Sequence, residues 1–333
     1  MHQKQAVAAA ATTAIALLAS GAGAAVAGTT PLSGTGTTRI AGANRFETAV
    51  KVSQRSFTSP QDVVYIASGE SFPDALAAGP AAARDGAPIL LVQRDAVPAV
   101  VQTELERLKP STIIVVGGDG AISSTTFNTL ATYAQKWQTY RAYGSNRYET
   151  AESLAQGWQT GEAGTVYLAS GESFADALGG GAAAAARKGA LLLTAKDTLP
   201  PATKRALQHL APKAVVVLGG TGAISQKVAD DVQAATNATV QRQGGTDRYD
   251  TAAKVAGGVW GATGARKVFL ASGTSFPDAL AATPAAAINN GPILLTRGTC
   301  TPKVTQSTRT VLKPALTVYL GGPTITYGGT TVC

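Results

Sequence analysis

Two arginines recur at the same places in three parts of the sequence. They occupy the first and seventh positions of a repeated word, R-x-x-G-x-[ND]-R-[FY]-[ED]-T-A. Guanidinium groups bind phosphate and carboxylate through bidentate hydrogen bonds, so converging arginines would form an anion site. The candidate ligand-binding arginines are Arg39, Arg45, Arg141, Arg147, Arg242 and Arg248.

A second repeated word, [YF]-[IL]-A-S-G-x-S-F-x-D-A-L, supplies an aspartate that could pair with these arginines. It recurs 102 residues apart, at Asp74, Asp176 and Asp278. Such pairing would hold one repeat to the next, and the positive charge would keep each carboxyl ionised. Because Arg and Asp recur together, structural pairing is the favoured interpretation, and loss of one partner would cost about 3 to 5 kcal/mol.

The serines of the second word are further candidates for ligand contact. They stand where a strand is expected to give way to a helix, so a hydroxyl there can cap the helix or hydrogen-bond a sugar. Capping is the default, but loops at the carboxyl ends of parallel strands also bind ligands. The candidate serines are Ser68, Ser71, Ser170, Ser173, Ser272 and Ser275.

The residues needed for common kinds of catalysis are scarce. Beyond residue 27 the only histidine is His209, which leaves no His-based triad and no His-rich zinc site. The glycine turns at 118–123 and 220–225 lack the third glycine of a nucleotide-binding loop. We therefore expect no cofactor, no metal and no enzymatic activity. A wall-processing hydrolase with an unrecognised pair of carboxylates stays open as an alternative.

Strands and helices alternate in each repeat, which indicates an α/β fold with parallel sheets and right-handed crossovers. The first repeat predicts strands over 62–67, 88–92 and 112–116 and helices over 74–84 and 98–108. The strands are apolar throughout, as buried parallel strands are. We expect three tandem Rossmann-like repeats in a compact assembly with pseudo-three-fold symmetry.

Residues 1–27 predict a secretory signal peptide, with Lys4, an apolar run and small residues up to Ala27. No later stretch approaches the roughly 20 apolar residues that a membrane span needs, so we expect no transmembrane segment in the mature chain. Removing residues 1–27 lowers the formal net charge from +8 to +7. The basic residues form no cluster, which argues against nucleic acid and favours an anionic polymer outside the cell.

The repeat period sets the expected domain limits. A short linker over 28–37 precedes repeats at 38–138, 139–239 and 240–333, and the third repeat has a truncated end without a closing helix. Cys300 and Cys333 are the only cysteines, and a disulfide is the economical interpretation in an exported chain. Closing that loop would contribute about 3 to 4 kcal/mol in the chain-entropy treatment.

Four spaced words together resemble the cell wall binding repeat 2 family of exported Gram-positive proteins. They are R-I-A-G-A-N-R-F-E-T-A, V-Y-I-A-S-G-E-S-F-P-D-A-L, P-I-L-L and V-V-G-G. The resemblance covers nearly the whole mature chain and implies a pseudo-trimer of Rossmann-like modules that binds the wall non-covalently. It also implies that the Ile-Leu-Leu runs take part in binding, although their pattern alone predicts buried strands. These residues are Ile89, Leu90, Leu91, Leu191, Leu192, Leu193, Ile293, Leu294 and Leu295.

We therefore expect a secreted, wall-associated protein that attaches to an anionic cell-wall polysaccharide through three repeats. Peptidoglycan is a second candidate partner. Besides the hydrolase, the remaining alternative is a surface-layer or adhesion protein whose repeats bind other proteins.

Overall fold

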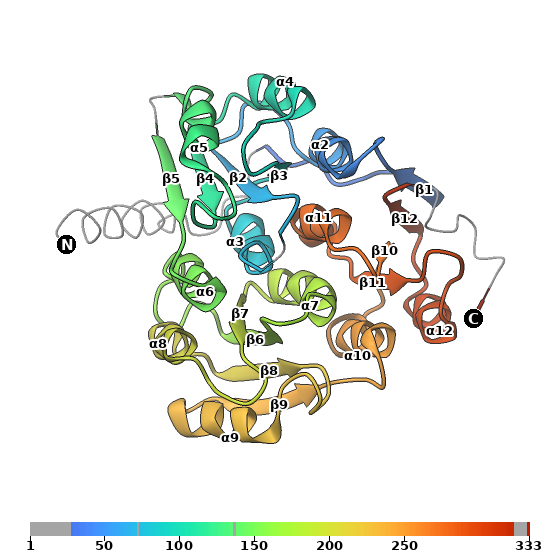
Figure 1. Cartoon of the computed structure of the whole chain (residues 1–333). Coiled ribbons are helices and arrows are strands. Elements are labelled where there is room, and N and C mark those ends of the chain that lie inside the picture. Colours follow the sequence, from blue (N-terminus) through green and yellow to red (C-terminus); the bar gives the residue numbers. More distant parts are fainter. Residues whose placement is uncertain (1–27, 72, 136–137, 323–331) are drawn as a thin grey trace.

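The computed structural model describes residues 28–71, 73–135, 138–322 and 332–333. The predicted signal peptide lies outside the described residues, as does the segment over 323–331 where the truncated end of the third repeat was expected. Three four-stranded parallel sheets surround a central group of helices (Figure 1). This arrangement confirms the predicted α/β class and the pseudo-three-fold assembly.

Each sheet has the same strand order. The first sheet is β3 (Ile89–Val92), β2 (Val63–Ser68), β4 (Thr112–Val116) and β5 (Gln138–Ala142). The second is β7 (Ala190–Thr194), β6 (Thr165–Ser170), β8 (Ala214–Leu218) and β9 (Thr239–Gln243). The third is β11 (Ile293–Thr296), β10 (Lys267–Ser272), β12 (Leu316–Leu320) and β1 (Gly36–Ile40).

The fourth strand of each sheet comes from the start of another repeat. β5 leads into the second repeat but pairs with β4, and β9 leads into the third but pairs with β8. β1 closes the ring by pairing with β12, with Arg39 opposite Tyr319 and Ile40 opposite Leu320. The repeat limits expected from the sequence at 38, 139 and 240 therefore fall inside these exchanged strands.

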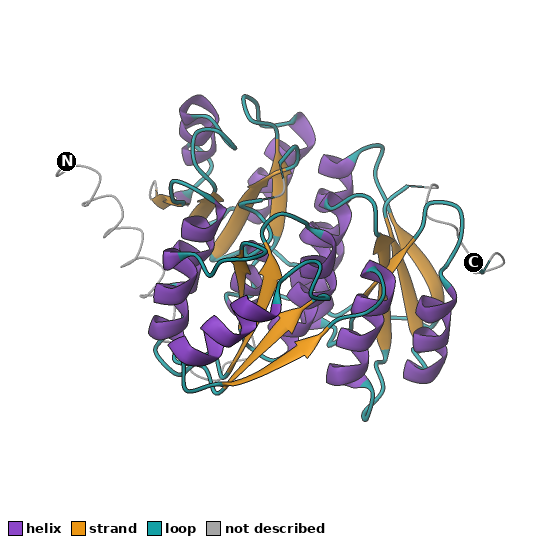
Figure 2. Cartoon of the chain, turned by 60° about the horizontal axis from the view of Figure 1, so that its bottom comes forward, coloured by secondary structure: helices purple, strands orange, loops and turns teal. Residues whose placement is uncertain are grey.

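Three helices rich in alanine form the centre of the ring: α3 (Ala78–Arg84), α7 (Ala175–Ala186) and α11 (Pro277–Ile288). Each of them packs against the other two (Figure 1). Small side chains allow this close approach, since a Cβ on Gly79 would lie 2.6 Å from Cγ2 of Thr283. Figure 2 shows the helices lying between and around the sheets.

A second set of helices joins neighbouring repeats: α2 (Arg45–Ser56), α6 (Arg147–Ala155) and α10 (Arg248–Trp260). Each packs on the central helix of the preceding repeat, so that α6 meets α3, α10 meets α7 and α2 meets α11. The remaining helices are α4 (Ala99–Leu108), α5 (Ser124–Ala131), α8 (Pro201–Leu210), α9 (Gln226–Ala235) and α12 (Lys303–Leu312).

One predicted helix starts later than expected. The helix predicted over 74–84 begins at Ala78, whereas Asp176 and Asp278 lie in the first turns of α7 and α11. Pro80 does not account for this difference, because the equivalent Pro284 lies inside α11, which still begins at Pro277. Asp74 stands in a turn before the helix rather than inside it.

The Ile-Leu-Leu runs form the edge strands β3, β7 and β11. Their nine side chains are at most 2% exposed. Each of these strands packs against the central helix of another repeat, β3 against α11, β7 against α3 and β11 against α7. They build the contact between repeats, and their side chains offer no surface to a ligand.

The predicted disulfide is confirmed, since Cys300 and Cys333 are bonded with their Cα atoms 5.9 Å apart. The backbone N–H of Lys303 also donates to the carbonyl of Cys333. No helix in the described part of the chain is long and apolar enough to cross a membrane.

Candidate functional site

The first arginine of each repeated word holds the Gly-Gly loop that follows the neighbouring strand. Arg141 donates through Nη1 to the carbonyls of Gly117 at 2.8 Å and Ile122 at 2.9 Å. Arg242 donates to the carbonyls of Gly219 and Ser225. Arg39 does the same across the ring closure, with Gly321 and Gly322 as acceptors. Because these arginines lie on the exchanged strands, they fix a loop of the preceding repeat.

The second arginine of each word holds the Ser-Gly loop of its own repeat. Arg45 donates to the carbonyl of Gly69, Arg147 to that of Gly171 and Arg248 to that of Gly273. Arg248 also reaches the preceding repeat, where its guanidinium lies 6.0 Å from the centre of the Phe174 ring.

Glycine is required in the Ser-Gly loops because an aromatic ring lies against each of them. A Cβ on Gly273 would lie 2.6 Å from the ring of Tyr249. A Cβ on Gly171 would lie at the same distance from the Tyr148 ring, as would one on Gly69 from the Phe46 ring. The aromatic residue directly follows the second arginine in the sequence. The two neighbouring side chains therefore fix the loop together.

The repeated aspartates face the next repeat, as the pairing hypothesis requires, and in two of them burial acts on the pKa against the neighbouring arginine. Burial raises the pKa of Asp176, and the hydrogen bond from Thr251 and the charge of Arg248 only partly offset this effect. Burial likewise raises the pKa of Asp278, opposed by Arg45 and then by the Thr48 hydroxyl.

No ion pair within the described residues joins the second arginines to these aspartates. The second arginines therefore attract these aspartates over a longer range. For Asp176 and Asp278, desolvation of the carboxyl has a larger effect on the pKa than the arginine has.

The six candidate serines divide into two groups. The first serine of each word ends a strand and closes its own turn, as Ser68 does by accepting from the N–H groups of Glu70 and Ser71 at 3.1 Å. Ser170 and Ser272 make the corresponding bond to the residue two positions on. By contrast, Ser71 and Ser173 line pockets between repeats, and Ser275 is exposed at the equivalent position.

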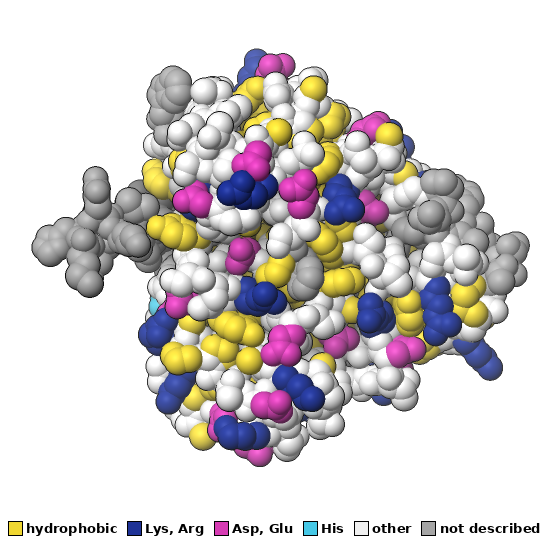
Figure 3. All heavy atoms as spheres, viewed as in Figure 1, with side chains coloured by type: hydrophobic (Ala, Val, Ile, Leu, Met, Phe, Trp, Pro, Cys, Tyr) yellow, Lys and Arg dark blue, Asp and Glu magenta, His cyan; other side chains and the backbone are white. Residues whose placement is uncertain are grey.

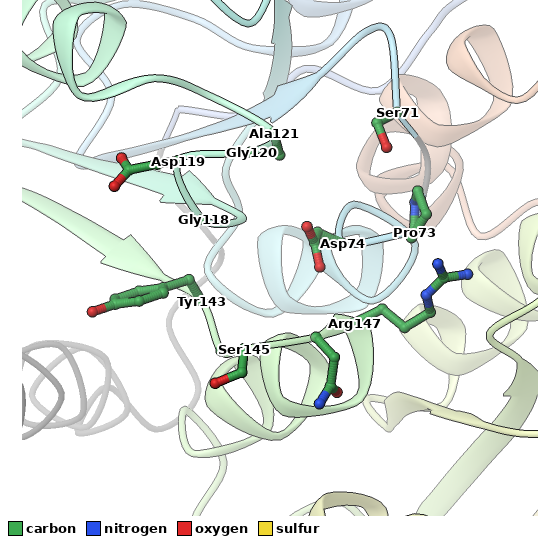
Figure 4. Close-up of a pocket in the computed structure, with 12 residues that line it drawn as sticks. Ser71, Pro73, Asp74, Gly118, Asp119, Gly120, Ala121, Tyr143, Ser145 and Arg147 are labelled. Carbon is green, nitrogen blue, oxygen red and sulfur yellow. The ribbon is translucent and has the colours of Figure 1, made fainter.

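A pocket of about 570 Å³ lies where the first repeat meets the second, and we call it the first junction pocket (Figure 4). Three loops form it: one after β2, the Gly-Gly loop after β4, and the loop that leads from β5 into α6. Its lining residues are Ser71, Pro73, Asp74, Gly118, Asp119, Gly120, Ala121, Tyr143, Gly144, Ser145, Asn146 and Arg147.

The second junction pocket occupies the equivalent place between the second and third repeats. Its volume is about 390 Å³, and Ser173, Asp176 and Arg248 correspond to Ser71, Asp74 and Arg147. At the third junction, Asp278 faces Arg45 and Thr48 in the same way. Residues 323–331, which follow the Gly-Gly pair of the third repeat in the sequence, lie outside the described residues.

The junction pockets combine donors and acceptors of hydrogen bonds. In Figure 4 the Asp74 carboxylate lies between Asp119 and Tyr143 on one side and Ser71 and Arg147 on the other. The amino end of α6 faces the pocket, but the Asn146 side chain already accepts from its first free N–H groups. Such a lining fits hydroxyl-rich ligands better than a bare anion.

Sequence reasoning missed Tyr143, Asp119, Ser145 and Asn146 as lining residues. The repeat pattern did contain Asn146, as the N or D before the second arginine, but only as part of a word. Tyr143 and Asp119 differ between repeats, so a search for repeated residues passes over them. A useful signal would have been their position, directly after the strands that end at this edge of the sheet.

On the face of the molecule that is viewed in Figures 1 and 3, the charged side chains form no single patch of one sign. Basic and acidic side chains alternate over that face (Figure 3). Within the described residues, no group of three or more His, Cys, Asp or Glu side chains is placed to hold a metal ion. The junction pockets remain the candidate sites, because residues of the repeated words line both of them.

Comparison with known proteins links this geometry to curated relatives. The chain is 31% identical over 260 residues to the N-acetylmuramoyl-L-alanine amidase LytC of Bacillus subtilis (strain 168), covering 78% of this chain and 50% of the amidase. It is 31% identical over 271 residues to the Amidase enhancer of the same organism, covering 81% and 36% of the two chains. The chain thus spans half or less of the length of these relatives.

Two solved structures have the same fold. Cwp6 from Clostridium difficile superposes with a TM-score of 0.79 at 26% identity, over 87% of this chain and 46% of Cwp6. Cwp8 from the same organism gives 0.78 at 27% identity, over 86% and 49%.

The family comparison confirms the resemblance drawn from the four repeated words. Residues 39–127, 141–229 and 242–332 each match the Cell wall binding domain 2 (CWB2). Each match begins at or within one of the exchanged strands and includes the Ser-Gly and Gly-Gly loops that line a junction. The chain therefore belongs to the Cell wall binding domain 2 (CWB2) family, whose members bind cell walls.

Proposed function

We propose that this chain attaches non-covalently to an anionic glycopolymer of the cell wall through its repeat junctions, and that it binds this polymer without catalysing a reaction. The observation that carries the proposal is the pair of equivalent pockets between successive repeats, each lined by polar residues of the repeated words. Wall binding itself follows from the family.

A long polymer suits this arrangement because it can engage several junctions at once. Binding at a second junction is then intramolecular, so modest single sites give a strong overall attachment. The excess of 28 basic over 20 acidic residues favours a polyanion and predicts that binding weakens with salt. Secretion through residues 1–27 would bring the protein to the wall.

The proposal separates binding from the activity of the amidase relative. The chain matches only half of LytC and about a third of the Amidase enhancer, so their whole-protein activities are not carried over. The hydrolase and adhesion alternatives each predict a different observation. A hydrolase would release soluble fragments from walls, and an adhesion protein would self-associate independently of salt.

The test is co-sedimentation of the protein, expressed without residues 1–27, with isolated walls before and after acid extraction of the anionic polymers. A salt series accompanies both arms. The proposal expects binding that falls with salt and disappears with the polymers. Binding unchanged by both treatments would overturn the anionic ligand and favour peptidoglycan or a protein partner.

Variants that fill the pockets locate the site. Ser71→Trp and Ser173→Trp each place a large side chain in the lining of a junction pocket, and Ser71 is exposed while Ser173 is half-buried, so thermal unfolding accompanies both variants. Both substitutions are expected to weaken wall binding, and the double variant more than either one. Val311→Trp is the matched control, because Val311 is 66% exposed on α12.

A further inference from the structure

The three junctions differ at one position beside the pocket. The residue that follows β5 is Tyr143, while the corresponding residues are Gly244 after β9 and Ala41 after β1. Tyr143 is 36% exposed and lines the first junction pocket. Its ring lies beside the Gly-Gly loop, since a Cβ on Gly118 would be 3.9 Å from Cδ2 of the ring.

The two pockets differ in where their second carboxylate lies, because the first has Asp119 in the Gly-Gly loop and the second has Asp247, whose carboxylate caps α10. Asp119 accepts a hydrogen bond from Ser124 at 2.9 Å and lies 3.5 Å from Nη2 of Arg141. These contacts hold the carboxylate in place while its side chain stays 71% exposed. The equivalent residue in the second junction pocket is Thr221, which carries no charge.

An aromatic face beside fixed carboxylates has a specific chemical use. The apolar C–H groups of a sugar ring pack on the face of an aromatic ring, and its hydroxyls donate hydrogen bonds to carboxylates. An anionic ligand group would instead meet two negative charges, those of Asp74 and Asp119. The guanidinium of Arg147 already donates to the carbonyl of Gly171, which reduces its capacity for an anion.

We propose that the first junction pocket binds an uncharged sugar ring of the wall polymer, which stacks on Tyr143 and donates hydroxyl hydrogen bonds to Asp119 and Asp74. This inference rests on the proposed function and makes the first junction the site that selects the sugar. The pocket volume of about 570 Å³ leaves room for a hexose and falls within the range of small-molecule sites. The second junction, without an aromatic residue at this position, contributes attachment with less selectivity.

The test uses saturation-transfer NMR with four neutral tetrasaccharides, built from glucose, mannose, galactose or N-acetylglucosamine, together with wall co-sedimentation. The protein variants are Tyr143→Ala, Tyr143→Phe and Asp119→Asn, with Val311→Ala as the control for loss of an exposed apolar side chain. Thermal unfolding confirms that each variant is folded.

The expected result is transfer to the sugar-ring protons of at least one neutral tetrasaccharide. This transfer should be lost in Tyr143→Ala, weakened in Asp119→Asn and kept in Tyr143→Phe and Val311→Ala. Stacking on one aromatic face corresponds to about three- to tenfold in affinity, and Tyr143→Ala should weaken wall binding by that factor.

The outcomes separate this inference from the proposed function. If the unsubstituted protein binds walls but Tyr143→Ala binds walls and tetrasaccharides equally well, the sugar site is overturned and the proposed function stands. If no form binds walls, the proposed function fails, and absence of transfer to every neutral tetrasaccharide then overturns the sugar site as well. Transfer that depends on Tyr143 supports the sugar site in either case.

Discussion

The hydroxyl of Thr251 in the third repeat lowers the pKa of the Asp176 carboxyl in the second repeat, and both side chains line the second junction pocket. The same hydroxyl accepts from the N–H of Gly245, in the loop that enters α10. Thr48 and Asp278 repeat this contact at the ring closure, where Thr48 accepts from the N–H of Gly42. A single threonine thus connects a pocket loop of its own repeat to a half-buried acid of the preceding one.

These half-buried acids predict that mild acid stabilises the junctions. Because the pKa of Asp176 and Asp278 is raised by burial, the folded state binds protons that the unfolded state releases. Their contribution to the free energy of unfolding therefore increases as pH falls from the raised pKa toward the ordinary value of 3.8, and is lost as pH rises. The double variant Asp176→Asn/Asp278→Asn should remove this dependence.

The measurement is urea unfolding of both proteins between about pH 7 and about pH 4. The double variant should gain stability relative to the unsubstituted protein near neutral pH, because no charge is left to desolvate. Asp95→Asn removes an exposed carboxylate and controls for the change in net charge. Identical pH profiles for the double variant and the unsubstituted protein would contradict the prediction.

Arg141 is predicted to act on binding by shaping a loop. Arg141→Met removes the hydrogen bonds to Gly117 and Ile122 and should lower the free energy of unfolding by about 1.5 to 3 kcal/mol. Wall binding should also weaken in the folded variant, because Asp119 loses its neighbouring charge.

Arg94→Met is the comparison for this prediction. The guanidinium of Arg94 is exposed and pairs with the adjacent Asp95, so its loss should cost less than about 1 kcal/mol. Urea unfolding and co-sedimentation measure both variants. Equal losses of stability in the two would show that the loop contacts contribute nothing.

Local sequence patterns predicted the positions of the strands and helices well, but they did not predict which strands pair in a sheet. The strand over 112–116 was predicted at its observed limits, because a buried apolar run is bounded by turn residues. The exchange of β5, β9 and β1 between repeats was not predictable, since a strand's sequence does not specify which parallel neighbour it joins. The period of 102 residues is the same whether the strand stays in its repeat or crosses over.

The candidate site was predictable only where residues repeat. The two arginine sets and Ser71 were found because they recur, whereas Tyr143 occurs at one junction only. The raised pKa of Asp176 was not predictable, since the sequence shows the neighbouring arginine but not the burial of the carboxyl. Periodicity correctly indicated that the Ile-Leu-Leu runs are buried.

Closure of the ring by β1 predicts a local effect of truncation. A chain that starts at residue 41 lacks β1, so β12 becomes an unpaired edge and its Gly-Gly loop loses the contacts of Arg39. Hydrogen exchange of the β12 amides should then accelerate. The equivalent strand β4 keeps its partner β5 and serves as an internal control. Unchanged protection of β12 would contradict a stabilising role for the closure.

Substitutions in the Ile-Leu-Leu runs are predicted to impair wall binding only through folding. Leu192→Ala removes a side chain that is 1% exposed and should lower the free energy of unfolding by about 2 to 5 kcal/mol. Below its unfolding transition the variant should bind walls like the unsubstituted protein, and binding should fall in parallel with the folded fraction on heating.

Ser71→Trp provides the opposite pattern, because it should leave stability unchanged while binding is weakened at every temperature. Circular dichroism and co-sedimentation, measured over the same temperature series, give the two quantities for each variant. If Leu192→Ala were fully folded and still failed to bind, the edge strands would act on the ligand directly. Since β7 packs on α3 of the first repeat, the stability that Leu192→Ala loses is that of the contact between the first two repeats, and binding returns with the folded fraction.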